Sequence, residues 1–158
     1  MWSFLVLSAN SGPLLPYDSD SWWHAIPLVP NLSLFIALLY IMYYILLEPV
    51  AGSLYSIILL YMVYNATNFN ASYPNHNTLA IIVHISSWIM QIAAHGFAEK
   101  RSPAFKDNIV QAFLLAPLFV WLEVLFAVGY RSGLQKRVSL EAELAIAKFK
   151  EEKGKKSE

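Results

Sequence analysis

The sequence contains no cysteine, which excludes disulfide bonds and thiolate metal sites. It also has few charges: 14% of its residues are charged, against roughly 25% in an average soluble domain. Glu48 is the only charged residue between Ser21 and Ala98. A chain of 158 residues that is 57% hydrophobic and so poor in charge has the composition of an integral membrane protein.

Several functional motifs are absent as well. The chain has no glycine-rich phosphate loop, no serine-nucleophile elbow and no HExxH zinc motif. Its net charge is zero, but eight basic and five acidic residues lie in the tail 131–158, and three basic and six acidic residues lie before it. The excess of basic over acidic residues in the tail is too small to predict nucleic-acid binding. A basic tail directly after the last apolar run predicts a cytosolic C-terminus.

Apolar runs predict an all-α bundle of about four transmembrane helices. The second run is short for a crossing, which normally takes ~20 residues, and Glu48-Pro49 separates it from the first. Four crossings put both termini in the cytosol. The expected spans are His24–Leu47, Val50–Tyr64, Thr78–Ala98 and Asn108–Tyr130.

Three regions are predicted along the chain. Residues 1–20 form an irregular N-terminal segment, for which a cleaved signal peptide is a weaker alternative. Residues 21–130 form the transmembrane domain, and residues 131–158 form a basic cytosolic tail with an amphipathic helix that begins at Ser139. Lys155 and Lys156 match a dilysine retrieval signal, which predicts a multi-pass protein of the endoplasmic reticulum membrane; an ordinary lysine-rich terminus is the alternative.

The segment Asn65–Asn77 is predicted to be a polar loop, because it is rich in asparagine and has no charged residue. It contains two N-glycosylation sequons, which begin at Asn65 and Asn70. With four crossings this loop faces the cytosol, where sequons are not used.

The stretch from residue 81 to residue 123 combines apolar runs with ionisable side chains. Such groups cost several kcal/mol in hydrocarbon unless they are satisfied, so their presence there indicates function. In the expected span Thr78–Ala98, the polar or aromatic residues that share one helix face are His84, Trp88, Gln91 and His95, and Glu99 continues that face. Glu123 lies late in the next expected span, Asn108–Tyr130.

Imidazole and carboxylate ligands without sulfur suit iron, manganese or zinc, and two histidines with one carboxylate are typical of non-haem Fe(II) oxygenases. The candidate ligands are His84, His95 and His24, with Glu99 or Glu123 as the carboxylate or as a group that orients an imidazole. His84 and His95 are separated by about 16 Å along a straight helix. Either the helix breaks, one histidine has another role, or the ligands come from different helices.

Each candidate also has a structural explanation. His84, His95 and Glu123 could form hydrogen bonds between helices. His24 follows two tryptophans and could simply lie at the membrane interface, and His76 could be solvated in the predicted loop. Trp88 could be a packing residue. Lys100 and Arg101 could bind the carboxylate of a lipid or could be an ordinary basic loop.

The motif H-x3-W-x2-Q-x3-H-G-x2-E-x3-P-A that begins at His84, with a later A-P-L-F-x3-E that ends at Glu123, resembles the membrane-bound 2-hydroxy fatty acid dioxygenases. The resemblance covers about Asn77–Arg131. Before this stretch the resemblance is limited to His24-Ala-Ile-Pro27. Within it, Ala94 stands where glycine is usual in that family.

The resemblance implies an Fe(II)-dependent enzyme of the endoplasmic reticulum that uses O2 to shorten a 2-hydroxy fatty acid by one carbon, as in phytosphingosine breakdown. It implies that His84 and His95 bind iron and that Glu99 and Glu123 support the site. We add Gln91 to the catalytic group and assign Trp88, Lys100 and Arg101 to the lipid substrate. A diverged, non-enzymatic membrane protein and a metal-free lipid isomerase or cyclase remain as alternatives. The oligomeric state stays open.

Overall fold

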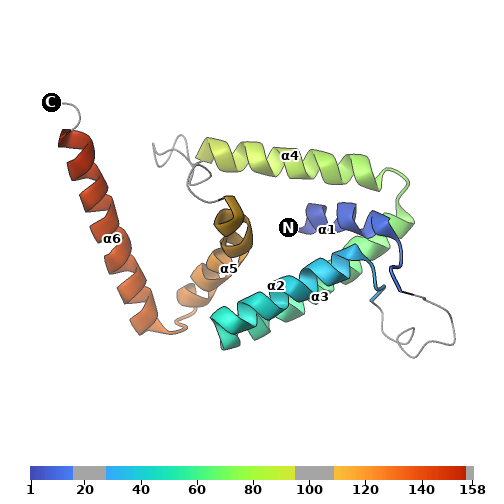
Figure 1. Cartoon of the computed structure of the whole chain (residues 1–158), viewed down its shortest axis with the longest axis horizontal. Coiled ribbons are helices and arrows are strands. Elements are labelled where there is room, and N and C mark those ends of the chain that lie inside the picture. Colours follow the sequence, from blue (N-terminus) through green and yellow to red (C-terminus); the bar gives the residue numbers. More distant parts are fainter. Residues whose placement is uncertain (16–27, 95–108, 156–158) are drawn as a thin grey trace. The chain divides into compact units, whose positions relative to one another are not determined.

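A computed structural model describes residues 1–15, 28–94 and 109–155 of the chain (Figure 1). These residues fall into two compact units, Met1–Phe119 and Val120–Glu158. All regular secondary structure in the described ranges is helical. The predicted all-α class is therefore confirmed.

Helices α2 (Leu32–Leu47) and α3 (Pro49–Ser72) form a hairpin in the first unit (Figure 1). Asn31 caps the start of α2, because its side-chain oxygen accepts a hydrogen bond from the Leu34 amide at 3.1 Å. Glu48 is extended, with φ −146° and ψ 95°, and ends α2. Pro49 opens α3, where its lack of an N–H costs nothing. The helix break predicted at Glu48-Pro49 is confirmed.

The two helices of the hairpin approach each other closely at Gly52. A Cβ atom at this position would lie 2.5 Å from the backbone carbonyl of Tyr44. Ala51 and Tyr44 beside it are fully buried. Small residues allow two helix backbones to come this near, as is common for helices that pack in membranes.

Residues 2–11 are helical and contribute to the core, so the predicted irregular segment 1–20 is wrong over this part; residues 16–20 lie outside the described residues. Helix α1 (Trp2–Ser8) and the short 3-10 helix η1 (Ala9–Ser11) precede the hairpin. Helix α1 lies against α3 and α4 (His76–Ala94), as Figure 1 shows. Leu5 and Val6 of α1 are fully buried. They pack in one cluster with Ala37, Val63, Ala66 and Ala80.

The predicted loop Asn65–Asn77 is wrong over most of its length, because α3 continues to Ser72 and α4 begins at His76. The polar residues at the end of α3 are not simply solvated; they bind α1 and the start of α2. Asn65 accepts a hydrogen bond from the Trp2 indole at 2.9 Å. Thr67 accepts one from the Asn31 amide at 3.1 Å. Both sequons thus lie in or at the end of a helix.

The second unit contains the end of α5 (Ile109–Ala127) and the whole of α6 (Ser132–Lys155). Gly129 ends α5, because its φ of 88° is favourable only for glycine. The amides of Gly129 and Tyr130 donate to the carbonyls of Phe126 and Leu125, which is a Schellman arrangement. Ser139, the predicted start of the tail helix, lies inside α6.

Helix α3 is the one helix in the described parts of the chain that is long and apolar enough to cross a membrane. Helix α2 and residues Leu114–Ala127 are apolar but shorter. The expected span Val50–Tyr64, which is short for a crossing, is therefore part of the best candidate, since α3 extends eight residues beyond Tyr64. The four-span arrangement stays a prediction.

Candidate functional site

One side of α4 faces α1, and the spacing of its residues explains why. His76, Ala80, His84 and Trp88 follow one another at intervals of four, so they share a helix face. Ala80 is fully buried and the other three are half-buried. The large apolar side chains on the rest of α4 are exposed, namely Leu79, Ile81, Ile82, Val83, Ile85, Ile89, Met90 and Ile92.

Both ring nitrogens of His84 have hydrogen-bonding partners. The Trp88 indole N–H donates to Nε2 at 3.1 Å, and the Ser3 hydroxyl lies 3.1 Å from Nδ1. Because an indole can only donate, Nε2 must be the unprotonated nitrogen. A neutral His84 then carries its proton on Nδ1 and donates it to Ser3. The two aromatic rings meet edge to face, with centroids 6.3 Å apart.

This geometry fits His84 as one ligand of a metal ion. A metal-binding histidine usually donates its other N–H to a fixed acceptor, and Ser3 provides that acceptor for Nδ1. Ser3 is buried, so the contact is well defined. Nε2 is then the nitrogen that would bind the ion, and its lone pair faces the Trp88 N–H.

The other predicted histidine ligands and one of the two candidate carboxylates fall on residues that the structure does not describe. His24, His95 and Glu99 lie outside the described residues, as do Lys100 and Arg101. Within residues 1–15, 28–94 and 109–155, no three His, Cys, Asp or Glu side chains gather where they could share a metal ion. The predicted ligand set, His84 included, thus stays a prediction.

Gln91 and Glu123, the two remaining candidates for catalysis, are both exposed. Gln91 follows Trp88 by three residues on α4. Glu123 lies on α5 in the second compact unit, whereas His84 lies in the first. Their catalytic roles stay predictions.

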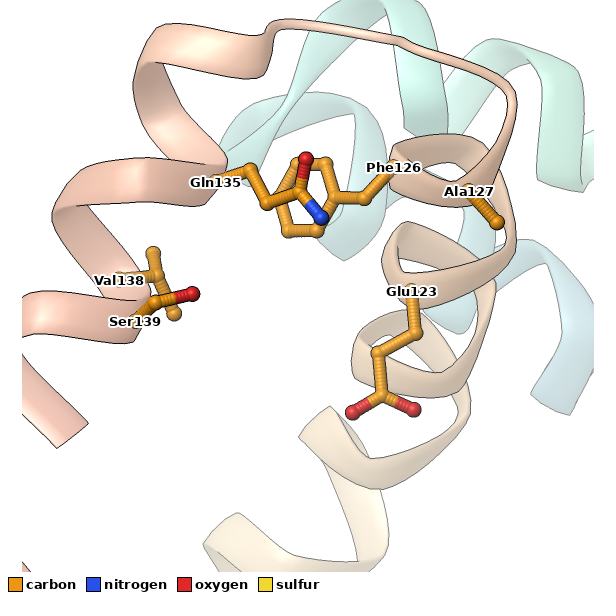
Figure 2. A pocket seen from close by; sticks show the side chains of 6 residues that line it. All are labelled: Glu123, Phe126, Ala127, Gln135, Val138 and Ser139. Carbon is orange, nitrogen blue, oxygen red and sulfur yellow. The ribbon is translucent and has the colours of Figure 1, made fainter. Parts of the chain in front are cut away.

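Glu123 lines a small open cavity between α5 and α6, shown in Figure 2. The cavity has a volume of about 320 Å³. Phe126 and Ala127 of α5 supply apolar surface, and Gln135 and Ser139 of α6 add two polar side chains. The cavity therefore combines polar and apolar side chains of the second unit.

A second polar cluster joins η1 to the connection between α3 and α4. The Asn10 amide donates to Asn77 at 2.6 Å, and its oxygen accepts from the Asn70 amide at 3.0 Å. His76 lies 3.1 Å from the same oxygen through Nε2 and 2.6 Å from the Tyr73 carbonyl through Nδ1. The interpretation of His76 as a merely solvated residue is therefore wrong. The cluster fixes the end of η1 against α4.

Sequence reasoning did not identify Ser3 or Asn10 as partners of the histidines. Both belong to the segment that was predicted to be irregular, and neither lies in a motif. A signal was nevertheless available: Trp2, Leu5 and Val6 recur at a helical spacing. That spacing predicts an apolar helix face, and therefore a helix that packs on the core.

Comparison with known proteins decides the family. The profile of the family described as 2-hydroxy-palmitic acid dioxygenase Mpo1-like matches residues 19–128. The chain belongs to the Mpo1-like family. This match confirms the suspected resemblance to 2-hydroxy fatty acid dioxygenases.

A relative of this Mpo1-like chain is the 2-hydroxy-palmitic acid dioxygenase MPO1 of Saccharomyces cerevisiae. The two are 29% identical over 136 residues, which cover 85% of this chain and 76% of the yeast protein. No solved structure matches the chain. The match to the yeast protein thus extends well beyond the motif around His84.

Proposed function

We propose that this protein is a non-haem Fe(II) dioxygenase that shortens a 2-hydroxy fatty acid by one carbon with O2. Membership of the Mpo1-like family and likeness to the yeast 2-hydroxy-palmitic acid dioxygenase support the proposal. The structural observation that carries it is the environment of His84. Its Nδ1–H is held by buried Ser3, and its Nε2 lone pair points along α4 toward Trp88.

The residues of this chain have separate roles in the proposed site. His84 binds the metal through Nε2, and His95 and His24 complete the histidine ligands. Glu99 or Glu123 supplies the carboxylate or orients an imidazole, and Gln91 contributes a neutral hydrogen-bonding group. When it is bound, Fe(II) supplies the activation of O2 that no side chain of the chain can perform.

The substrate is proposed to be a lipid that enters from the membrane. The apolar helices hold its acyl chain beside Trp88, and Lys100 or Arg101 binds the carboxylate head group. Exposed apolar side chains on α2, α3 and α4 support a membrane location, because a soluble monomer rarely exposes so many of them. We propose a multi-pass protein of the endoplasmic reticulum, with Lys155 and Lys156 as its retrieval signal.

The proposal is tested with detergent-purified full-length protein, Fe(II), air and 2-hydroxypalmitate. Oxygen uptake and the appearance of a fatty product that is one carbon shorter are measured together. His84→Gln and His95→Gln are expected to lower the rate at least about 100-fold, as is usual for the loss of a ligand or its support. His76→Gln, a change of the same kind on the same helix, should retain most of the rate. Full activity in either ligand variant contradicts the proposal.

A non-enzymatic function is favoured by one observation: both ring nitrogens of His84 have hydrogen-bonding partners within the protein. A histidine that only joins helices looks the same. In that case His84→Gln lowers the unfolding temperature, while the wild type neither turns over lipid nor binds iron. A metal-free isomerase or cyclase is distinguished in the same assay, because its turnover resists chelators.

A further inference from the structure

Positive charge gathers around the turn between α5 and α6 (Figure 1). The stretch 124–140 contains three basic residues and no acidic one. The three are Arg131, Lys136 and Arg137, and all of them belong to the second compact unit. Because no carboxylate in this stretch balances them, they attract anions to this part of the surface.

Two of the three basic side chains line one open cavity. Arg131 and Arg137 share it with Gly133 and Leu134, and its volume is about 450 Å³. Arg131 precedes Leu134 by three residues and Arg137 follows it by three, so the two arginines flank the leucine on one face. Leu134 is half-buried, and both arginines are exposed. The cavity therefore combines an apolar centre with two positively charged flanks.

The backbone holds Arg131 in an unusual conformation. Its φ is 44°, in the left-handed region where glycine or asparagine is usual. Hydrogen bonds fix the turn on both sides of this residue. The Tyr130 amide donates to the Leu125 carbonyl at 2.9 Å, and the Arg131 carbonyl accepts from the Leu134 amide at 2.8 Å. A long charged side chain at a position that suits glycine is unfavourable for the backbone, so its presence indicates a role for the guanidinium.

We propose that this cavity binds a phosphate group, and that the phosphate belongs to the head group of an anionic phospholipid. Guanidinium groups bind phosphate oxygens through paired N–H donors. Arg131 also interacts elsewhere within the protein, and the five N–H donors of a guanidinium allow it to bind phosphate at the same time. This inference rests on the proposed membrane location and not on the proposed iron chemistry.

The position of the cavity and its apolar centre favour a lipid over a soluble phosphate. The apolar part of α5 runs from Leu114 to Ala127, and Arg131 follows four residues later. An apolar helix in a membrane ends near the lipid phosphates, where basic side chains are common. Val138 follows Leu134 by four residues, shares its face and is 52% exposed. These two side chains can contact acyl chains while the arginines stay at the phosphates.

The test uses the full chain in neutral detergent micelles and phosphatidic acid with a fluorophore on its acyl chain. Energy transfer from the tryptophans to the fluorophore measures binding. Arg137→Gln and Arg131→Asn should each weaken binding by about 5-fold or more. Asparagine is chosen at position 131 because it tolerates a positive φ. Lys136→Gln is the matched control: it removes one charge beside Arg137 but does not line the cavity, and its affinity should stay within about twofold of the wild type.

Each outcome supports or overturns the site. Equal weakening in all three variants would mean that the lipid responds only to the general charge of the stretch, which overturns a built site. No binding by the wild type, or no loss in Arg137→Gln, overturns it as well. Inorganic phosphate should not displace the lipid; displacement would assign the cavity to a soluble phosphate and overturn the lipid assignment. The assay contains neither iron nor a 2-hydroxy acid, so its result is independent of the proposed enzymatic function.

Discussion

The hairpin of α2 and α3 and the contact between α1 and α4 are built in different ways. At the hairpin, Gly52 brings two backbones together and Tyr44 fills the space beside it. At the other contact, a side-chain hydrogen bond joins Ser3 of α1 to His84 of α4, and Asn10 of the adjoining η1 bonds to His76 and Asn77. The hairpin contact is close and mainly apolar, whereas the contact with α4 adds side-chain hydrogen bonds to the apolar packing of Leu5 and Val6 on Ala80.

This difference separates scaffold from site. Close packing of small residues is how helices associate when both neighbours and surroundings are apolar. Polar side chains are costly in such surroundings, so the chain has reason to keep them only where they orient something. In the described residues several of them meet around His76 and His84 of α4, the helix that carries the proposed chemistry.

The largest effect is expected at the hairpin. Gly52→Val should destabilise the protein by about 3 kcal/mol or more, because its Cβ would collide with the Tyr44 carbonyl and the backbone cannot yield easily. Thermal unfolding in detergent measures this. Gly133→Ala is the control, since a Cβ there meets nothing within 4 Å. Equal stability of both variants would show that the close approach is not part of the scaffold.

Substitutions in the core of helix α1 should lower stability nearly as much as the change at the hairpin. Leu5→Ala is expected to cost about 2–5 kcal/mol, because Leu5 is fully buried in the core cluster. Leu14→Ala, the same change at a half-exposed position, should stay within about 0.5 kcal/mol of the wild type. Similar unfolding temperatures for the two variants would mean that α1 does not belong to the core.

A single hydrogen bond within the first unit should have a smaller effect. Tyr44→Phe removes the hydroxyl that donates to the Leu114 carbonyl at 2.7 Å, and should cost about 1 kcal/mol. Tyr61→Phe, at an exposed position of α3, should change stability by less than about 0.5 kcal/mol. The same loss in both variants would assign it to the tyrosine hydroxyl in general rather than to this bond.

Ser33 should show a gain in stability. Its hydroxyl is fully buried and has no hydrogen-bonding partner among the described residues. Ser33→Ala should therefore raise the free energy of unfolding by about 1 kcal/mol, since an unsatisfied polar group is removed. Ser86→Ala on the exposed side of α4 corrects for the better helix propensity of alanine. A loss of stability at Ser33 would reveal a partner and a polar role for α2.

Much of the fold could be predicted from local signals. The all-α class follows from long apolar runs, and the break at Glu48-Pro49 follows from proline geometry. The end of α3 could not be predicted in this way. Asn65, Thr67 and Asn70 favour loops by their own propensities, and only their partners in other elements make the helix favourable there.

The site also divides into features that local sequence signals predict and features that depend on distant residues. Helical spacing correctly put His84 and Trp88 on one face, and the structure adds that they touch. Spacing could not supply Ser3, which is 81 residues away in sequence. Contacts at such separation depend on how whole helices pack, which a periodic pattern does not encode. Convergence of His84 with His95 and a carboxylate therefore stays a prediction.

The most direct test of the account is the iron content of protein purified after expression with added iron. The wild type and His76→Gln should each hold close to one iron per chain, and His84→Gln should hold almost none. Equal iron in His84→Gln and the wild type, or no iron in any of the three, would contradict the proposal that His84 is a ligand in a metal site.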